Sequence, residues 1–303
     1  MRLMAKLLAR VAPWLPLAKP QADPEGPWSF RVLGEQDTRD LWAIVNEDPV
    51  ANVFVASHLE SRGSAAPSLA GGEIIGMFRH NELRAACWAG VNLVPVGVTD
   101  ETGAIFGDHL GRSGRTFSSI FGLSEGVMDL WSTLEDYSGE PFDVRPTQPL
   151  MAIHSDPLIA PAEDLRFTRP EELDRLLPAC AAMFEEEVGY SPFIGGSDHY
   201  RRRVASLIGR KHSLAAFDDD GRVVFKAELG TVSSQAVQVQ GVWMNPDHRG
   251  EGRSAAYMAA VVVAARSLAP TVSLYVNSYN ARAIAAYKRV GFDQVDTFAT
   301  ILF

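Results

Sequence analysis

In the first half of the chain, apolar and polar positions alternate in short runs that are separated by Gly and polar turns. A period of two predicts strands, whereas apolar residues three and four apart predict helices. The predicted strands are residues 28–33, 72–79, 82–90, 92–98, 118–122 and 143–155. The predicted helices are residues 35–48, 52–61, 102–111 and 125–139, the last with Val127, Leu130, Trp131 and Leu134 on one face. The strand at 143–155 is expected to close this half.

The second half repeats this order of elements. Its predicted strands are residues 165–168, 213–220, 222–233, 236–244, 272–278 and 292–303. Its predicted helices are residues 170–189, 197–210, 251–268 and 280–291. We expect Ser197 or Asp198 to cap the second helix, and Gly291 to end the last helix in a left-handed conformation. Each half therefore has the same order of elements: one strand, two helices, a run of strands, and then a helix, a strand, a helix and a final strand. This shared order indicates a duplicated architecture without a sequence repeat.

Two Pro-rich polar segments, residues 19–27 and 156–164, predict the boundaries. They divide the chain into a flexible tail with its linker at 1–27, a first domain at 28–158 and a second domain at 165–303. A length of 303 residues suits two folded domains of this size.

The first twenty residues are basic and apolar, but Lys6 and Arg10 interrupt the apolar run, and Pro13 and Pro16 break any helix early. This pattern fits a secretory signal poorly and is too short to span a membrane, so we predict no stable membrane insertion. Two alternatives remain open for this segment: a disordered or loosely docked tail, and a weak interfacial anchor.

Composition narrows the function classes. Hydrophobic residues make up 47% of the chain and charged residues 21%, which is typical of a globular protein. A net charge of −9 argues against nucleic acid as a partner, because such binding relies on basic patches. The only cysteines, Cys87 and Cys180, are predicted to be buried thiols in a reducing compartment, which favours the cytoplasm. Nothing in the sequence suggests a metal site.

Residues 245–256, NPDHRGEGRSAA, combine a turn, two glycines and the start of an Ala-rich helix. The first N–H groups of a helix are unsatisfied and carry partial positive charge, so they attract phosphate. Gly250 and Gly252 let the backbone approach an anion closely, and Arg249 adds a charged fork. The stretch matches neither a Walker loop nor a dinucleotide fingerprint. It predicts a pyrophosphate cradle, and the alternative is a plain Gly-containing turn.

Two signatures carry a family resemblance. Arg249-x-x-Gly252-x-Ser254, after a strand, resembles the coenzyme-A loop of the GNAT acyltransferase superfamily, in which Gly or Ala is usual where Ser254 stands. Residues 273–292 resemble the second GNAT signature, in which an Asn opens a helix that carries a Tyr and ends in Gly-Phe. The residues of this signature are Asn280, Tyr287, Gly291 and Phe292.

The whole chain resembles two-domain GNAT proteins whose first half belongs to a family of unknown function. The motifs NLVPVGV, SSIFG, DLWSTL and VRPTQPLM carry this in the first half, and EEEVGYSP, VQGVWMNP and SLYVN in the second. The resemblance implies an α/β fold with a mixed sheet, built as tandem GNAT-like domains. The domain at 28–158 has no Arg-x-x-Gly-x-Gly pattern after its NLVPVGV strand, so it is expected to be degenerate and to bind no coenzyme A there. The domain at 165–303 is expected to be the catalytic one.

The resemblance also implies where acetyl-CoA binds. Strands 237–244 and 272–277 are expected to splay apart, so that the pantetheine arm pairs with the backbone of Val242 and Met244. A backbone N–H of Gly241, Val242 or Trp243 would stabilise the oxyanion. The full set expected to bind coenzyme A is Val242, Trp243, Met244, Arg249, Gly250, Glu251, Gly252, Arg253, Ser254, Asn277, Asn280 and Tyr287.

Several catalytic roles follow as alternatives. Tyr287 is the candidate acid for the leaving thiolate, or else a packing aromatic. Asn280 either contacts the pantetheine or caps its helix. Glu228 and Glu187 are candidate bases, although Glu185, Glu186 and Glu187 also fit a solvated helix face. The candidate acceptor site comprises Glu187, Tyr190, Phe193 and Gln240.

These features predict an acyl-CoA-dependent N-acetyltransferase that acetylates a primary amine on a small molecule or a protein. The alternative is a non-catalytic module that binds coenzyme A or a protein partner. A nucleotide phosphotransferase is excluded because the chain lacks a phosphate-loop lysine. The oligomeric state remains open.

Overall fold

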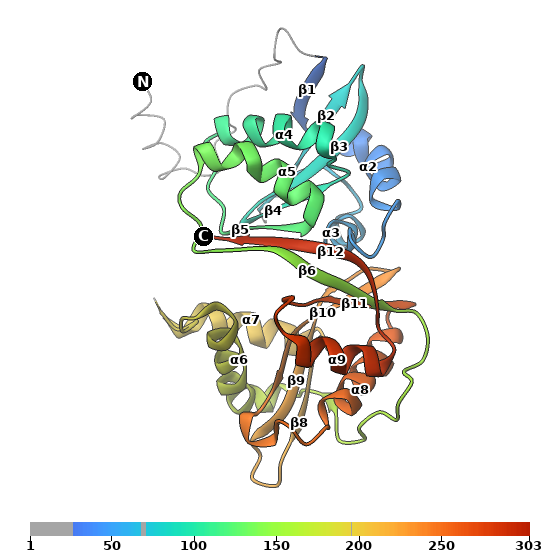
Figure 1. Cartoon of the computed structure of the whole chain (residues 1–303), viewed down its shortest axis with the longest axis vertical. Coiled ribbons are helices and arrows are strands. Elements are labelled where there is room, and N and C mark those ends of the chain that lie inside the picture. Colours follow the sequence, from blue (N-terminus) through green and yellow to red (C-terminus); the bar gives the residue numbers. More distant parts are fainter. Residues whose placement is uncertain (1–26, 68–70, 195) are drawn as a thin grey trace. The chain divides into compact units, whose positions relative to one another are not determined.

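The computed structural model describes residues 27–67, 71–194 and 196–303. Apart from Pro27, the predicted tail and both alternatives for its role lie outside the described residues. No helix in the described ranges combines the length and the apolar character that crossing a membrane requires. The chain divides into two compact units (Figure 1), which interleave along the sequence and are described separately.

The first unit comprises residues up to Glu47, Ser61–Pro146 and Phe298–Phe303. Its sheet has the order β1-β2-β3-β4-β5-β12. All neighbours are antiparallel except β4 and β5, which are parallel. The strands are β1 (Trp28–Val32), β2 (Glu73–Arg79), β3 (Glu82–Ala89), β4 (Asn92–Val96), β5 (Ser119–Leu123) and the end of β12 (Asp293–Leu302). The helices are η1 (Glu35–Asp37), α2 (Thr38–Val45), α4 (Asp100–Arg112), α5 (Ser124–Leu134) and η2 (Glu135–Tyr137).

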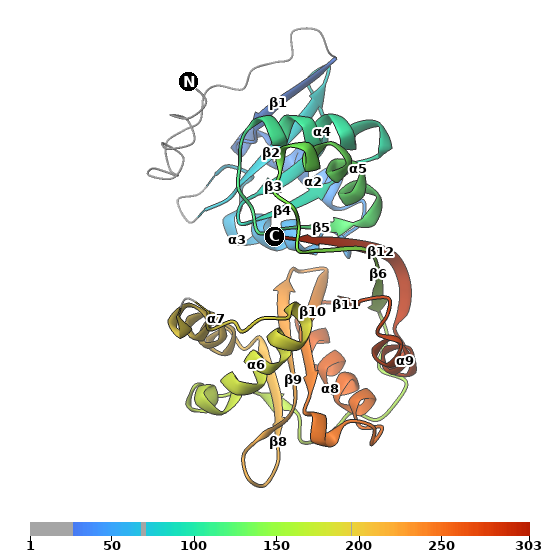
Figure 2. The ribbon, with the colours of Figure 1, turned by 60° about the vertical axis from the view of Figure 1, so that its left-hand side comes forward.

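The second unit comprises Asp48–Glu60 and Thr147–Thr297, with the sheet order β6-β11-β10-β9-β8-β7. Its strands are β6 (Asp143–Ile153), β7 (Arg166–Phe167), β8 (Ser213–Phe217), β9 (Val223–Val232), β10 (Ala236–Met244) and β11 (Thr271–Tyr275). Its helices are α3 (Val53–Arg62), η3 (Pro170–Glu172), α6 (Leu173–Val188), α7 (Ser197–Gly209), η4 (Pro246–His248), α8 (Ser254–Arg266) and α9 (Ala281–Val290). Helices α6 and α7 cover one face of this sheet, and α8 and α9 cover the other (Figure 2).

The mixed α/β fold agrees with the sequence prediction, and most predicted elements are found within a few residues of their expected bounds. Gly291 ends α9 with φ 113° and ψ 14°, the predicted left-handed cap. The predicted cap of α7 is wrong. Gly196 occupies the N-cap without a side-chain hydrogen bond, so Ser197 and Asp198 lie in the first turn. Both cysteines are buried free thiols, as predicted, and burial raises the pKa of Cys87 to about 12.

The closing strands differ from the expectation. The predicted strand at 143–155 was expected to close the first half, but Leu150–Ile153 of β6 pairs with β11 in the second unit. The first unit is completed instead by Phe298–Leu302 of β12, which pairs with β5 (Figure 1). Each unit thus contains a strand from the other half of the sequence. The division of the sequence into domains at 28–158 and 165–303 stays a prediction.

Helices α4 and α5 of the first unit approach each other at backbone distance. A Cβ atom on Gly103 would lie 2.3 Å from Asp129 Cβ, and one on Gly107 would lie 2.1 Å from the Leu130 carbonyl oxygen. These glycines recur every four residues along α4, so they share one face of the helix. The two helices pack this closely because side chains are absent from that face.

An ion pair beside η3 makes the stability of the second unit depend on pH. Arg166 holds Glu172 with two hydrogen bonds of 2.8 and 2.5 Å, and the Arg169 N–H donates to the same carboxylate. The Arg166 bonds are the main cause that lowers the pKa of Glu172 from 4.5 to about 2. A carboxyl group with a depressed folded-state pKa stabilises the fold above its unfolded pKa, and this contribution is lost as the pH falls.

We therefore expect the Glu172→Gln variant to have a lower Tm than the wild type at pH 7, and the difference to shrink as the pH falls from about 4.5 to about 2. Thermal denaturation monitored by circular dichroism at several pH values measures this difference. Glu171→Gln, at the neighbouring exposed position, is the control. A Tm difference that stays constant down to the lowest pH would contradict the assignment.

Candidate functional site

Strands β10 and β11 separate partway along their length. They pair in parallel only from Ala236–Thr271 to Gln238–Ser273. Beyond this point β10 continues to Met244 and β11 to Tyr275, and no further pairing joins them in the described chain. The splay expected between residues 237–244 and 272–277 is therefore present, and it frees one backbone edge of β10.

A β-bulge lies in the freed part of β10. Gln240 pairs with Glu228 of β9, but Trp243 pairs with Lys226, so β10 has one extra residue. Gly241 has φ 58° at this point, and a Cβ atom there would lie 3.1 Å from both Glu228 Cδ and Lys226 Nζ. The conformation and the close approach explain the glycine. Gly241 and Val242, two of the expected oxyanion donors, lie in this bulge.

The loop before α8 presents a row of four backbone amides that no described residue pairs with. Within the described residues, the N–H groups of Gly250, Glu251, Gly252 and Arg253 donate no hydrogen bond. Gly250 and Gly252 have φ values of 90° and 76°, and apart from the adjoining residues no described atom lies within 4 Å of a Cβ built on either glycine. Exposed amides that lead into a helix N-terminus form a cradle for an anion. Ser254 is the first residue of α8, so the predicted loop and helix meet as expected.

The Arg249 side chain forms hydrogen bonds with β10 and α6. Its Nε donates to the Met244 carbonyl at 2.9 Å, and its Nη2 donates to both carboxylate oxygens of Glu186 at 2.9 and 2.8 Å. Trp243 Nε1 donates to the same carboxylate at 3.0 Å. Arg249 and Trp243 thus tie the loop and the end of β10 to α6. Sequence reasoning treated Glu186 only as one of three acidic residues of a helix face and missed this role.

Arg253 and α8 support the other side of the loop. Arg253 Nη2 donates to the Tyr257 hydroxyl at 2.7 Å, and that hydroxyl donates to Asp164 at 2.8 Å. The Tyr257 ring stacks on Phe225, with the ring centroids 4.9 Å apart. Burial, and after it the Asp164 carboxylate, raise the pKa of Tyr257 to about 12. Sequence reasoning did not single out Tyr257; its spacing of four residues from Arg253 on one helix was the available signal.

Tyr287 lies on α9 with its ring buried in the core of the second unit. The side chain belongs to the core of the second unit, next to Phe292, and the residue is 7% exposed. Its hydroxyl forms no hydrogen bond with any described residue. Burial, together with the negative charge of Glu187 at the end of α6, raises the pKa of Tyr287 well above its usual value. The fold therefore brings Glu187 near enough to Tyr287, one hundred positions later in the chain, for the carboxylate charge to raise the pKa of the phenol.

Two asparagines precede and open α9. The Asn280 side-chain oxygen accepts from the Ala283 N–H at 3.1 Å, so Asn280 is the N-cap. Its side-chain amide has no partner among the described residues and is free to donate. Asn277 accepts from Gln148 of β6 at 2.8 Å and donates to the Tyr279 hydroxyl at 2.9 Å. Gln148 was not expected at the site, because β6 was assigned to the first half.

Glu228 lies in a buried charged cluster below the bulge. Lys226 Nζ donates to Glu228 Oε1 at 2.7 Å, and both side chains are almost inaccessible, at 0% and 2% exposure. Gln240 Nε2 donates to Glu228 at 3.3 Å, and Arg203 of α7 lies 3.8 Å away. Burial has the largest single effect on Glu228 and opposes its charge, but Lys226, Arg203 and Gln240 together outweigh burial and lower the pKa of this carboxyl group. An ion-paired carboxylate is a weak base, so this arrangement favours a positioning role for Glu228.

The loop between α6 and α7 presents aromatic side chains. Tyr190 packs edge-on against Phe184 at 5.5 Å, and Phe193 packs against Tyr200 at 5.9 Å. Tyr190 and Phe193 keep 46% and 36% of their surface exposed. Both belong to the predicted acceptor site, and they follow Glu187 in sequence. The loop can therefore offer an aromatic surface together with a carboxylate.

The equivalent place in the first unit is constructed differently. Strands β4 and β5 also separate, since they pair only at Asn92–Ser119 and Leu93–Ile120. However, helix α5 starts tightly against the loop after β4, because a Cβ atom on Gly126 would lie 3.1 Å from the Val98 carbonyl oxygen. With α4 and α5 also in backbone contact, little space remains between these elements.

Two parts of the chain match known protein-family models. Residues 180–292 match the family model described as Acetyltransferase (GNAT) family. Residues 72–176 match a domain of unknown function, DUF4081. No curated protein is significantly similar in sequence to the chain.

Solved structures share the fold over nearly the full length. A GCN5-related N-acetyltransferase from Sphaerobacter thermophilus has a TM-score of 0.58 at 16% identity, covering 92% of this chain and 95% of its own. A GNAT-family acetyltransferase from Colwellia psychrerythraea has a TM-score of 0.53 at 14% identity, covering 91% and 99%. A tandem GNAT protein from the clavulanic acid biosynthesis pathway has a TM-score of 0.52 at 12% identity, covering 90% and 98%.

Proposed function

We propose, from the premise that residues 180–292 form a GNAT acetyltransferase domain, that the protein moves the acetyl group of acetyl-CoA to a primary amine. The observation that supports this most directly is the row of free amides at Gly250–Arg253, at the start of α8. A diphosphate suits such a row because each N–H can donate to a phosphate oxygen and the helix dipole adds attraction. Arg249 holds the loop in place through its ion pair with Glu186 of α6.

The separated strands give the donor its second anchor. Beyond Gln238, the β10 edge that faces β11 has free backbone groups, and a pantetheine amide chain can pair with those of Val242 and Met244. The free side-chain amide of Asn280 offers a further donor. Ser254 at the helix start, like the amides before it, faces the place of the diphosphate in this proposal.

Acetyl-CoA supplies a thioester: the amine nitrogen bonds to its carbonyl carbon, the carbon–sulfur bond breaks, and coenzyme A leaves as a thiolate. Backbone N–H groups at the Gly241 bulge stabilise the negative oxygen, an effect of about 3 kcal/mol for one donor. Tyr287 gives its hydroxyl proton to the thiolate. Its raised pKa keeps the phenol protonated until that moment, and its hydroxyl has no competing partner among the described residues.

The acceptor amine must lose a proton, because amines of the lysine type titrate near 10.4. We propose Glu187 as the base, directly or through water, in preference to Glu228, which Lys226 neutralises. Glu187 lies at the end of α6, and its charge already reaches Tyr287. Tyr190 and Phe193 would hold the apolar part of the acceptor, and Gln240 would orient a water molecule from the Glu228 side.

The experiment follows free thiol release from acetyl-CoA with a panel of primary amines. Calorimetry measures acetyl-CoA binding by the wild type and by Gly252→Val. Valine at φ 76° is strained and its side chain lies over the cradle, so we expect binding to weaken by about tenfold or more.

The matched control is Gly209→Val. Gly209 ends α7, and no atom lies within 4 Å of a Cβ built there. Unchanged acetyl-CoA binding in Gly252→Val would overturn the assignment of the cradle. Tight binding without thiol release for any amine would instead support the non-catalytic module.

A further inference from the structure

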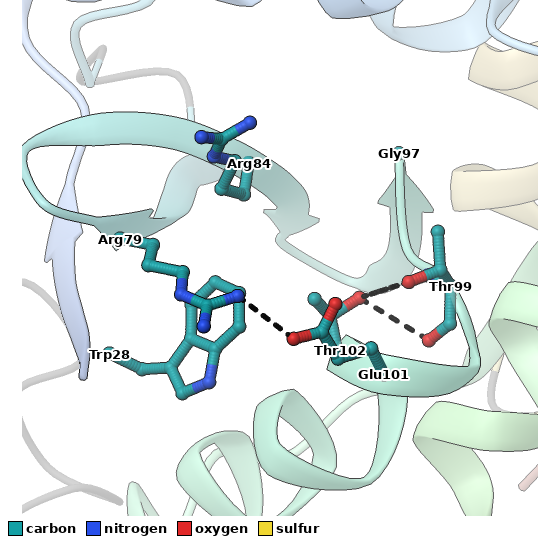
Figure 3. A pocket seen from close by; sticks show the side chains of 7 residues that line it. All are labelled: Trp28, Arg79, Arg84, Gly97, Thr99, Glu101 and Thr102. Atoms are coloured by element: carbon teal, nitrogen blue, oxygen red, sulfur yellow. Dashed lines mark hydrogen bonds and ion pairs between the residues drawn. The ribbon is translucent and has the colours of Figure 1, made fainter. Parts of the chain in front are cut away.

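The first unit has a cavity of about 270 Å³, whose lining residues all belong to that unit, whereas the proposed acetyl-CoA site belongs to the second unit. Its walls come from three neighbouring strands, from the segment that joins β4 to α4, and from the first turn of α4 (Figure 3). The lining residues are Trp28, Arg79, Arg84, Gly97, Thr99, Glu101 and Thr102. Cofactor and drug sites have volumes of roughly 300–1,000 Å³ and mostly apolar walls. This smaller, charged cavity suits a small polar molecule.

Opposite charges stand side by side in this cavity. Arg79 Nη1 lies 3.0 Å from Glu101 Oε1, and the Arg79 guanidinium stacks over the Trp28 ring at 5.2 Å (Figure 3). Arg79 is therefore held by both a carboxylate and an indole. Arg84 reaches the cavity from β3, and Glu82, outside the lining, pairs with its Nη2.

Each of these groups keeps hydrogen-bonding capacity for a ligand. Among the described residues, Glu101 Oε2, Arg79 Nη2 and Arg84 Nη1 have no partner. The Arg79–Glu101 pair is largely solvent-exposed, so it contributes little stability and can accommodate a ligand without loss to the fold.

Hydrogen bonds and close packing hold the remaining wall together. Thr102 Oγ1 accepts from the Thr99 N–H at 2.9 Å and lies 3.3 Å from the Thr99 hydroxyl, which fixes the start of α4. Gly97 has φ 65°, and a Cβ atom there would lie 2.6 Å from Ile44 Cγ2. A larger residue would therefore clash at this point of the wall.

We propose that this cavity binds a small zwitterion with a carboxylate and an ammonium group close together, which is the chemistry of a free α-amino acid. The carboxylate binds the guanidinium groups of Arg79 and Arg84, and the ammonium binds Glu101. A simple anion would face the Glu101 carboxylate, and a simple cation would face two guanidinium groups. A ligand that carries both charges can contact all three charged side chains of the lining, each through a group of opposite charge.

The test measures binding to the full chain and is independent of acetyl transfer. Saturation-transfer NMR screens the twenty proteinogenic L-amino acids at pH 7, and calorimetry follows the tightest binder. We expect that amino acid to bind about tenfold more tightly than either its deaminated acid or its decarboxylated amine. Arg84→Gln and Glu101→Gln should each weaken its binding by about tenfold.

Arg112→Gln and Glu125→Gln are matched controls on exposed positions of α4 and α5, and both should bind as the wild type does. The proposal is overturned if no amino acid binds at about 10 mM, if the deaminated acid binds equally well, or if both lining variants behave as the wild type. Binding that is lost in Glu187→Gln but kept in Arg84→Gln would place the ligand in the second unit and would also overturn it.

Discussion

Replacing Tyr287 by Phe should lower the kcat of acetyl transfer by about 10²-fold or more, the usual contribution of a positioned proton donor. The substitution removes only the hydroxyl, which has no hydrogen-bond partner among the described residues, and it leaves the buried ring against Phe292. The thiolate would then leave without a proton from the protein. Because the ring still packs, the affinity for acetyl-CoA should change by less than about threefold, within 1 kcal/mol.

Steady-state thiol release and calorimetry separate these two quantities. Tyr137→Phe is the matched control, because it removes the hydroxyl that bonds Asp108 in the first unit and touches no residue of the site. Equal losses of kcat and of acetyl-CoA affinity in Tyr287→Phe would identify Tyr287 as a packing or binding residue. An unchanged kcat would exclude the acid role.

Replacing Gly107 by Ala should destabilise the protein by about 2–3 kcal/mol, the cost of overpacking a closely packed interface. The new Cβ atom would lie 2.1 Å from the Leu130 carbonyl oxygen and 2.4 Å from Thr133 Oγ1, so α4 and α5 must move apart. Helix propensity acts in the opposite direction, because Ala in a helix interior is favoured over Gly by about 1 kcal/mol. The sign of the change in the free energy of unfolding therefore shows whether the packing clash or the helix propensity dominates.

Denaturant unfolding followed by tryptophan fluorescence measures this change, since Trp28, Trp42, Trp88 and Trp131 lie in the first unit. The control is Gly139→Ala in the same unit, where no atom lies within 4 Å of the new Cβ atom. That substitution should leave stability unchanged or raise it by about 0.4–1 kcal/mol. A stabilised Gly107→Ala variant would contradict the close approach of α4 and α5.

This packing gives a physical reason for the expected difference between the two halves. In the first unit, glycines bring α4 and α5 together, and the start of α5 abuts the loop after β4. In the second unit, the loop before α8 has bare amides and open space above its glycines. Because the first half lacks an Arg-x-x-Gly-x-Gly pattern, the sequence predicts that it binds no coenzyme A. The close packing of α4 against α5 supports this as a proposal.

Local features of the chain were readable from the sequence, because neighbouring residues determine them. The alternation of apolar positions identified most strands and helices, Gly291 marked the end of α9, and Gly250 and Gly252 marked the loop before α8. The separation of β10 and β11 was also expected, although only through the family resemblance. Apart from this separation, each of these features depends on backbone conformation over a few residues.

Only the tertiary structure decided which distant segments became partners. Periodicity predicts a strand at 143–155 and another at the C-terminus, but it does not encode that β6 pairs with β11 and β12 with β5. It likewise could not show that Lys226 neutralises Glu228 inside the core, or that Glu186 holds Arg249. Long-range pairing and burial set the partners and pKa values of these charged groups. The sequence alone therefore determined the elements and the loop before α8. The fold determined which charged side chains remain free to act.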